Sequence, residues 1–221
     1  MVNLAIVEDH RMFRDFLKEL TSREKGYRII GEAGDAAAAR ELIDSKPIDL
    51  LILDLNLPDG DGFEIAEHAL QVRPEAKILA LSSHCDEYTI SRILSSGVHG
   101  FVDKNDQSAD VLREAIAAVA GGRLFFTEAV SRVKRAIRED PRAFTKIFTE
   151  REIEILCLIG SGLSDLEVAR RTTLSASTIQ WHRKRILSRL RLHSTRDLIR
   201  YALGKGITRM NLVRPPGSTV P

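Results

Sequence analysis

Cysteine and tryptophan are scarce in this 221-residue chain, and it contains no long apolar run. Its two cysteines, Cys85 and Cys157, lie far apart and lack the paired spacing of a metal-thiolate site. We therefore expect neither a disulfide nor a zinc centre, but two small buried hydrophobic side chains.

The apolar runs fall well short of the roughly 20 residues that a membrane-spanning helix needs. An acidic pair, Glu8 and Asp9, comes too early for a signal peptide. A cytoplasmic protein with no membrane partner is the resulting expectation.

A strong overall charge is also missing, since the formal net charge is only +2, but the two halves differ. Residues 1–127 carry 14 Lys and Arg against 22 Asp and Glu, whereas residues 128–221 carry 19 against 9. An acidic module is thus followed by a basic one, and a basic module suits an anionic partner such as a nucleic acid. A solvated basic helical surface would give the same count, so charge alone leaves both interpretations open.

The first half alternates short apolar runs with helical patterns. Five runs have the length and composition of buried strands: NLAIV, YRIIGEA, DLLILDL, KILAL and GFVD. The segments that follow them repeat apolar residues at the spacing of amphipathic helices, and several end at a Pro or a Gly. Strands that alternate with helices need crossover connections, which produce a parallel sheet covered on both faces. Residues 1–125 are therefore predicted to form a doubly wound α/β domain with a five-stranded parallel sheet.

The second half contains no convincing strand. Residues 126–146 have the pattern of a charged linker helix that breaks near Pro141. Four residues with N-cap chemistry follow, three of them with an acidic residue three positions later: Thr149, Ser164, Ser175 and Ser194. These caps predict four short helices within residues 147–208. The tail, residues 209–221, is expected to be disordered.

Polar residues follow the predicted strands at the points where the strands end. In an open parallel sheet these ends lie on one edge, where ligands bind. The residues gathered there are Glu8, Asp9, Asp54, Ser82 and Lys104. Three carboxylates in close proximity repel one another unless a cation neutralises them, and hard oxygen ligands suit Mg²⁺. Asp54 could then act as a carboxylate nucleophile for a phosphoryl group, with Lys104 and Ser82 contacting the phosphoryl oxygens.

Each of these residues also has an ordinary structural interpretation. Glu8 and Asp9 could cap the first helix, Lys104 could be a surface cation, and Ser82 could begin a turn. Considered singly, these interpretations are at least as good as the functional one. Their joint occurrence at the ends of predicted strands favours a site.

Residues 1 to about 125 resemble the receiver domain of two-component response regulators, which has a flavodoxin-like fold. The resemblance lies in the motifs IVEDH, LDLNLPDGDG, LALSSH and GFVDK, in that order. It implies that Asp54 accepts a phosphoryl group from the histidine of a sensor kinase. It also implies a Mg²⁺ site formed by Glu8, Asp9, Asp54 and the backbone carbonyl of Asn56.

The same resemblance assigns Phe101, three residues before Lys104, the role of a switch aromatic. Such a residue turns inward when Ser82 engages the phosphoryl group. Phe101 is equally suited to a plain core position, so this role depends on the resemblance. The family more often has Asp-Asp in place of Glu8-Asp9 and Thr in place of Ser82, but both departures keep the functional groups.

The basic run SASTIQWHRKRILSRLRL predicts a helix with two distinct faces. Ile179, Ile186 and Leu190 fall on one side, and Ser177, Trp181, Lys184 and Ser188 fall on another. Two short helices precede it with tight joints, which is the pattern of a helix-turn-helix whose second helix lies in a DNA major groove. Arginines 183, 185, 189 and 191 would supply charge for DNA phosphates.

The segment from FTEREIEI to ILSRLRL resembles the LuxR-type DNA-binding domain, and the whole chain resembles the NarL/FixJ-type response regulators. The resemblance implies that Gln180, Trp181 and Lys184 face base edges, whereas Thr178, His182 and Arg185 lie near the DNA backbone. Trp181 is bulkier than the residue expected at its position, so it either contacts a thymine methyl group or packs against a neighbouring helix. Residues of the last helix, Leu198, Ile199 and Ala202, would belong to a dimer interface.

These observations predict a non-enzymatic, phosphorylation-controlled transcription factor. Its partners would be a sensor histidine kinase, promoter double-stranded DNA and, when phosphorylated, a second copy of the chain. One rival hypothesis is a DNA-binding regulator that works without phosphorylation or under the control of a protein partner. Another is an aspartyl-phosphate phosphatase, which would need a second acid two residues after Asp54, where Asn56 stands.

Overall fold

The computed structural model describes residues 1–24, 26–105 and 108–208. The described chain divides into two compact units: residues 1–85 and 90–132 form the first, and residues 86–89 together with those after Arg132 form the second. One boundary thus lies inside helix α6 (Glu128–Glu139). Within the described ranges no helix is both long and apolar enough to cross a membrane. The predicted disordered tail lies outside the described residues.

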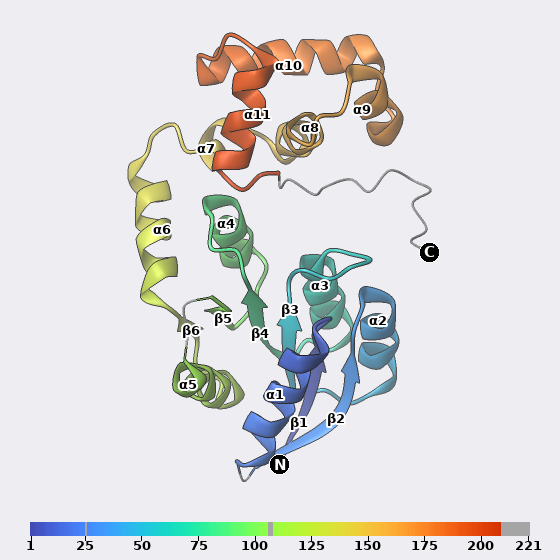
Figure 1. Cartoon of the computed structure of the whole chain (residues 1–221), viewed down its shortest axis with the longest axis vertical. Helices are drawn as coiled ribbons and strands as arrows, with labels where there is room; N and C mark the ends of the chain where they lie inside the picture. The colour runs from blue at the N-terminus through green and yellow to red at the C-terminus, as the bar shows by residue number, and fades with distance from the viewer. Residues whose placement is uncertain (25, 106–107, 209–221) are drawn as a thin grey trace. The chain divides into compact units, whose positions relative to one another are not determined.

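The first unit is built on a parallel sheet (Figure 1). Its strands are β1 (Val2–Val7), β2 (Tyr27–Ala33), β3 (Leu50–Asp54), β4 (Lys77–Ser82), β5 (Gly100–Asp103) and β6 (Phe125–Phe126). They lie in the order β2-β1-β3-β4-β5-β6, and all neighbouring strands are parallel. The predicted doubly wound α/β fold is confirmed. The sheet has one strand more than predicted. The sequence did not reveal β6, because this strand is only two residues long and has no periodicity of its own.

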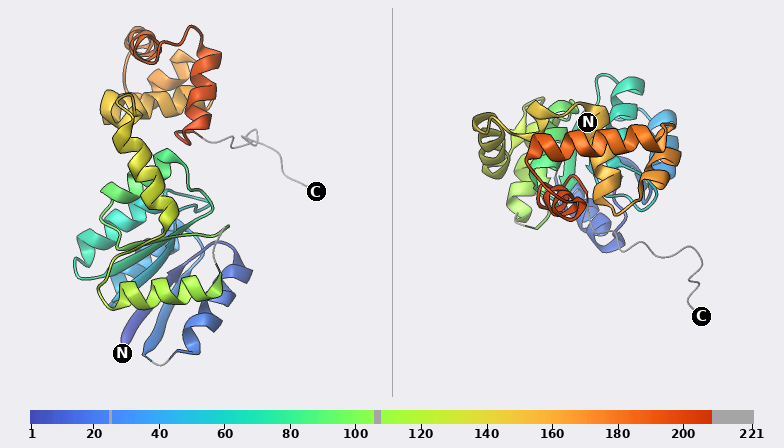
Figure 2. Two further views of the ribbon diagram at one scale, coloured as in Figure 1. Left: turned by 90° about the vertical axis from the view of Figure 1, so that its left-hand side faces the viewer. Right: turned by 90° about the horizontal axis from the view of Figure 1, so that it is seen from above.

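Five helices cover the two faces of this sheet (Figures 1 and 2). They are α1 (Arg11–Ser22), α2 (Ala36–Ser45), α3 (Gly62–Val72), α4 (Glu87–Ser95) and α5 (Ala109–Ala120). Leucine and isoleucine side chains from β1, β3 and β4 pack against α1 and α5 in one large core. Helices α2 and α3 contact each other on the opposite face. With both faces covered, a central strand has no solvent side, which is why β3 is apolar along its whole length until Asp54.

The second unit is helical, as predicted. After α6 come α7 (Phe144–Ile147), α8 (Glu150–Gly160), α9 (Asp165–Thr172), α10 (Ala176–Leu190) and α11 (Thr195–Gly204). The break between α6 and α7 contains Pro141. All four predicted N-caps accept a backbone N–H of the first helical turn, and Thr149 and Ser164 form complete capping boxes. The core of this unit joins apolar residues of every helix from α7 to α11.

The cysteine prediction was wrong in one respect. Cys85 and Cys157 are each half-buried rather than buried, and no disulfide joins them. Cys157 lies on α8 at the margin of the helical core, and Cys85 lies in the segment that follows β4.

Candidate functional site

The carboxyl ends of three strands bring two acids and one cation together. Asp54 is the last residue of β3, Glu8 follows β1, and Lys104 follows β5. The Lys104 Nζ donates to Glu8 Oε2 and to Asp54 Oδ2, each at 2.7 Å. Both carboxylates are almost completely buried, with exposures of 0% for Glu8 and 2% for Asp54. These residues are distant in sequence, so their contact depends on the parallel order of the strands.

Negative charge at this site exceeds what Lys104 neutralises. Burial raises the pKa of Glu8 above its usual value; the hydrogen bond from Lys104 opposes this, and the charge of Asp54 adds to it. A buried carboxyl group whose pKa is raised is ionised at a cost, which an added cation would reduce. The oxygens of Glu8, Asp9 and Asp54 are the hard ligands that Mg²⁺ prefers, so the donor set fits this ion.

The remaining predicted residues of the first unit lie around Asp54. The backbone N–H of Asn56 donates to Asp54 Oδ1 at 2.9 Å, and the Asn56 side-chain amide donates to Ser82 Oγ at 3.0 Å. Ser82 is buried and also accepts the backbone N–H of His84 at 3.0 Å. Phe101, on β5, is completely buried. The structure thus gathers Asn56 and Ser82 at the carboxylate and places Phe101 in the core.

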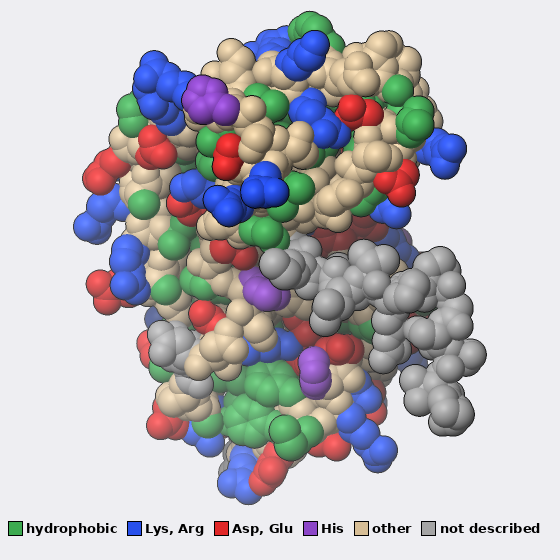
Figure 3. Space-filling model, turned by 45° about the horizontal axis from the view of Figure 1, so that its top comes forward, with side chains coloured by type: hydrophobic (Ala, Val, Ile, Leu, Met, Phe, Trp, Pro, Cys, Tyr) green, Lys and Arg blue, Asp and Glu red, His purple; other side chains and the backbone are tan. Residues whose placement is uncertain are grey.

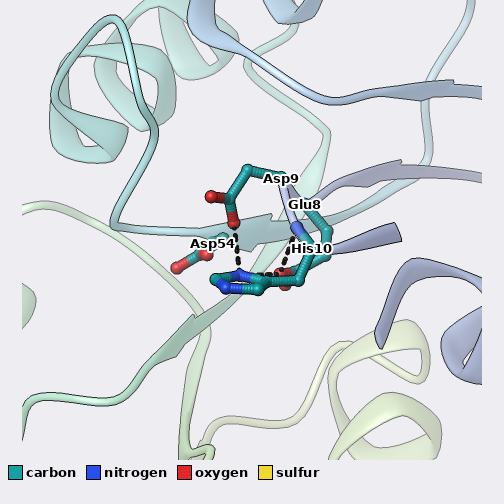
Figure 4. Close-up of side chains that lie close together, drawn as sticks. All are labelled: Glu8, Asp9, His10 and Asp54. Atoms are coloured by element: carbon teal, nitrogen blue, oxygen red, sulfur yellow. Dashed lines mark hydrogen bonds and ion pairs between the residues drawn. The ribbon is translucent and has the colours of Figure 1, made fainter. Parts of the chain in front are cut away.

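His10, which sequence reasoning did not include, also belongs to this cluster (Figure 4). Its Nδ1 lies 2.8 Å from Asp9 Oδ1 and 3.6 Å from Glu8 Oε1. One ligand atom from each of Glu8, Asp9, His10 and Asp54 lies within 4.8 Å of the others. The only signal in the sequence is that His10 directly follows the acidic pair. That adjacency does not show whether the ring points toward the acids or toward solvent.

Helix α10 has the two faces that its sequence predicts. Ile179 and Ile186 are completely buried in the core of the second unit. The following residues are exposed: Ser177, Gln180, Trp181, Lys184, Arg185, Ser188 and Arg189. Thr178 and His182, which were expected near a DNA backbone, are half-buried. Lys and Arg side chains are frequent on the face of this unit that Figure 3 shows.

The single tryptophan of the chain lies on the exposed face of α10. Trp181 is 53% exposed. Its ring meets the imidazole of His182 edge-on at 4.9 Å between centroids, and the Arg185 guanidinium lies 5.0 Å from its centroid. Both contacts come from residues of the same helix. This arrangement orients the indole ring while leaving half of it accessible to a ligand.

Two of the predicted DNA-contacting arginines also bind a buried acid. Arg189 Nη1 donates to both oxygens of Glu152, at 3.0 and 2.9 Å, and Arg185 Nε lies 3.3 Å from Glu152 Oε1. Glu152 lies on α8 and is 3% exposed. Arg189 also donates to the backbone carbonyl of Ile147 at 2.8 Å. The Arg189 guanidinium therefore ties α10 to α8 and α7.

Several other residues that were expected to contact DNA or a second copy of the chain make their contacts inside the second unit. The Arg183 guanidinium donates to Asp165 and to Thr195, which joins α10 to the starts of α9 and α11. Leu198 and Ala202, which were expected at a dimer interface, are completely buried in the unit's own core. Ile199 keeps partial exposure. Of the three α11 residues that were expected at a dimer interface, only Ile199 therefore has accessible surface.

Comparisons with known proteins agree with both units. Residues 4–117 match the response regulator receiver domain family, and residues 146–202 match the luxR family of bacterial regulatory proteins. The chain is 31% identical to the nitrate/nitrite response regulator protein NarL of Escherichia coli K12, over 86% of this chain and 90% of that protein. It is 28% identical to the Fimbriae Z protein of the same strain, over 90% and 95%.

A solved structure shows the same architecture. RcsB from Salmonella enterica serovar Typhimurium, bound to a promoter in the presence of a beryllium fluoride phosphomimetic, superimposes with a TM-score of 0.64. It is 25% identical, and the match covers 90% of this chain and 97% of that one. The matches span both units in their order along the chain. The chain therefore belongs to the NarL/FixJ-type transcriptional response regulators, in which a receiver domain is followed by a LuxR-type DNA-binding domain.

Proposed function

We propose that Asp54 is the phosphoacceptor of this response regulator and that a sensor histidine kinase supplies the phosphoryl group. The observation that carries the proposal is the buried Asp54 carboxylate, bound on one oxygen by the Lys104 ammonium and on the other by the Asn56 N–H. An Asp54 oxygen forms a bond to phosphorus while the bond from phosphorus to the kinase imidazole nitrogen breaks. Lys104 then neutralises charge on the transferred group.

The acidic cluster supplies the cation site for this step. Glu8, Asp9, Asp54 and the backbone carbonyl of Asn56 would hold Mg²⁺. When bound, Mg²⁺ offsets the negative charges of the carboxylates and of the incoming phosphoryl group. The grouping of three carboxylates, two of them buried, around the single ammonium of Lys104 supports this placement.

Ser82 and Phe101 form the proposed switch. The Ser82 hydroxyl accepts two N–H groups, from the Asn56 side chain and the His84 backbone, so its own proton remains available for donation. Donation to a phosphoryl oxygen on Asp54 would draw Ser82 and its following segment toward the site. Phe101 on the adjacent strand β5 pairs with Ala80 of β4 and would hold the inward position that accompanies this movement.

The second unit would bind promoter DNA through α10. Ser177, Gln180, Trp181 and Lys184 lie on its exposed face and would reach base edges in the major groove. Thr178, His182, Arg185 and Arg189 would lie near phosphates. Phosphorylation would favour a homodimer on two half-sites, with Ile199 as the accessible position on α11.

The test is sedimentation velocity of the full chain with Mg²⁺, with and without beryllium fluoride as a mimic of the aspartyl phosphate. We expect a shift from monomer to dimer in the wild type and none in Asp54→Asn. The matched control is Asp110→Asn, which changes an 88% exposed aspartate on α5 and should behave as the wild type does. Intact-mass measurement after incubation with acetyl phosphate should show one added phosphoryl group in the wild type and in Asp110→Asn, and none in Asp54→Asn.

DNA binding separates the proposal from its rivals. A duplex selected from a random-sequence pool should bind the beryllium fluoride form more tightly than the untreated protein. Equally tight binding by Asp54→Asn under phosphorylating conditions would favour a regulator that works without phosphate. A phosphatase would need an acid at position 56, and Asn56 instead donates through its amide to Ser82.

A further inference from the structure

The imidazole of His10 points into the acidic cluster although it has access to solvent. The side chain is 77% exposed and stands at the N-cap position of α1, but it makes no capping hydrogen bond to that helix. Figure 4 shows the ring between the carboxylates of Asp9 and Glu8, with Asp54 beside them. This orientation gives the ring a hydrogen bond with Asp9 Oδ1 at 2.8 Å in place of a cap on the helix. Its nearest partners are the carboxylates of the cation site.

The distances suit a shared coordination sphere. Octahedral ligands about 2.1 Å from an ion lie roughly 3 Å apart when adjacent and about 4.2 Å apart when opposite. His10 Nδ1 is 2.8 Å from Asp9 Oδ1 and 3.6 Å from Glu8 Oε1, and the four ligand atoms of the cluster all lie within 4.8 Å of one another. Only small movements would therefore place them around one ion.

Lys104 binds one oxygen of each of the two buried carboxylates and does not contact the other. Its ammonium contacts Glu8 Oε2 and Asp54 Oδ2. The histidine lies nearest the other Glu8 oxygen, Oε1. The ammonium and the imidazole thus approach different oxygens of Glu8, so an ion near His10 need not displace Lys104.

We propose that His10 Nδ1 is a ligand of this cation site, which makes it a mixed nitrogen and oxygen site that binds a first-row transition ion such as Mn²⁺ more tightly than Mg²⁺. Mg²⁺ prefers oxygen ligands only, whereas Mn²⁺ accepts an imidazole in addition to carboxylates and water. The inference rests on the proposed function, because it adds a ligand to the site assigned there to Mg²⁺.

The competing interpretation is a simple contact between His10 and Asp9, in which the imidazole acts as a hydrogen-bond donor or a cation. The two interpretations predict opposite effects of removing His10 on the affinity for Mn²⁺. If His10 only occupies a carboxylate oxygen, its removal frees that oxygen and tightens the binding of Mn²⁺ and Mg²⁺ alike. If His10 is a ligand, its removal weakens Mn²⁺ binding and leaves Mg²⁺ binding nearly unchanged.

The experiment is a Mn²⁺ titration of the full chain followed by electron paramagnetic resonance, with Mg²⁺ affinity measured by competition. In His10→Asn we expect Mn²⁺ affinity to fall by roughly tenfold or more, a loss seen even when outer-shell partners of metal ligands are removed. Electron spin echo modulation of wild-type Mn²⁺ should show coupling to an imidazole nitrogen, and the variant should lack it. The matched control is His68→Asn, because His68 Nε2 also lies 2.8 Å from an aspartate, Asp44, outside the cluster.

Three results would overturn the inference: unchanged Mn²⁺ affinity in His10→Asn, tighter binding of both ions, or no nitrogen coupling in the wild type. The nitrogen coupling is measured on the wild-type protein, so its absence could not be caused by a variant that fails to fold. A different result would overturn the proposed cation site as well. In that case Mn²⁺ would not bind the wild type, or Glu8→Gln would leave its affinity unchanged.

Discussion

Gly62, the first residue of α3, lies directly against the backbone of Asp54, the proposed phosphoacceptor. A methyl group built on Gly62 would be 2.6 Å from the Asp54 carbonyl oxygen and 2.5 Å from Leu55 Cα. The Gly62 N–H donates to the Leu55 carbonyl at 3.2 Å, and Asn56 pairs with Asp61 across the loop. The Pro- and Gly-containing loop after β3 therefore folds back against the end of the strand, beside Asp54.

Gly62→Ala should disturb the Asp54 site. The added methyl group would meet backbone atoms that have no freedom to rotate away, and overpacking of this kind costs about 1–3 kcal/mol. We expect lower stability in urea unfolding followed by circular dichroism, together with weaker Mg²⁺-dependent binding of beryllium fluoride. Gly204→Ala is the control, because a Cβ on Gly204 meets nothing within 4 Å. Equal behaviour of the two variants would contradict this account of the loop.

The sequence predicts the sheet well because burial on both faces leaves a direct trace in it. A covered parallel strand is apolar at every position, as β3 is up to Asp54, so strand ends and the residues that follow them are visible. Strand β6 left no such trace: it is defined by pairing with Gly100 and Phe101 rather than by its two phenylalanines. Its existence depends on tertiary contact, which sequence periodicity does not report.

Side-chain orientation in the site was less accessible to sequence reasoning. The convergence of Glu8, Asp54 and Lys104 follows from strand order, but the direction of the His10 ring does not. The contact between α8 and α10 could not be predicted from the sequence either. Glu152 was predicted only as part of a capping box, and its contact with Arg189 depends on how the two helices cross. Burial of Leu198 and Ala202 likewise depends on packing that helix periodicity leaves open.

His99 should make the first unit less stable as the pH falls below 6.5. Burial, with a smaller effect from Lys77, lowers the pKa of His99 in the folded chain below its usual 6.5. Its Nδ1 accepts the Ile78 backbone N–H at 3.2 Å, which requires that nitrogen to be unprotonated. The unfolded chain therefore binds the proton first, so this contribution to stability is fully present above pH 6.5 and is lost as the pH falls from 6.5 through the lower pKa of the folded chain.

The measurement is urea unfolding of the wild type and His99→Asn across pH 5 to 8, followed by circular dichroism. The Asn side-chain oxygen can accept the Ile78 N–H without titrating, so the variant should lose less stability on acidification. Below pH 6.5 the free energy of unfolding of the variant should therefore rise relative to that of the wild type. Parallel pH profiles would mean that His99 has no part in the acid sensitivity of this unit.

Glu152→Gln should destabilise the second unit by about 1–3 kcal/mol at pH 7, the cost of leaving buried hydrogen-bonding groups poorly paired. Burial alone would raise the pKa of Glu152, but the Thr149 hydrogen bonds and the charges of Arg189 and Arg185 together lower it below 4.5. A lowered pKa contributes stability above pH 4.5, which disappears as the pH falls through the folded value. The wild type and the variant should therefore become more alike in acid.

Fluorescence of Trp181, the only tryptophan, reports unfolding of the second unit in this experiment. The control is Glu154→Gln on the same helix, because its carboxylate is 48% exposed and pairs only with neighbouring Arg151 in the contacts described. An exposed pair of this kind is worth about 0.2–1 kcal/mol at most. A Glu152→Gln protein as stable as Glu154→Gln at pH 7 would show that the arginines bind Glu152 without stabilising the fold.

Trp181→Ala should separate DNA recognition from folding. Because the ring is half exposed and contacts only His182 and Arg185 among its described aromatic and cationic neighbours, its loss should change the free energy of unfolding by no more than about 0.5 kcal/mol. Affinity for the selected duplex should fall roughly tenfold, about 1.4 kcal/mol, if the indole contacts a thymine methyl group. Affinity for unrelated duplexes should change much less, because phosphate contacts dominate that binding. A loss of several kcal/mol in stability, measured by circular dichroism, would instead assign Trp181 to helix packing.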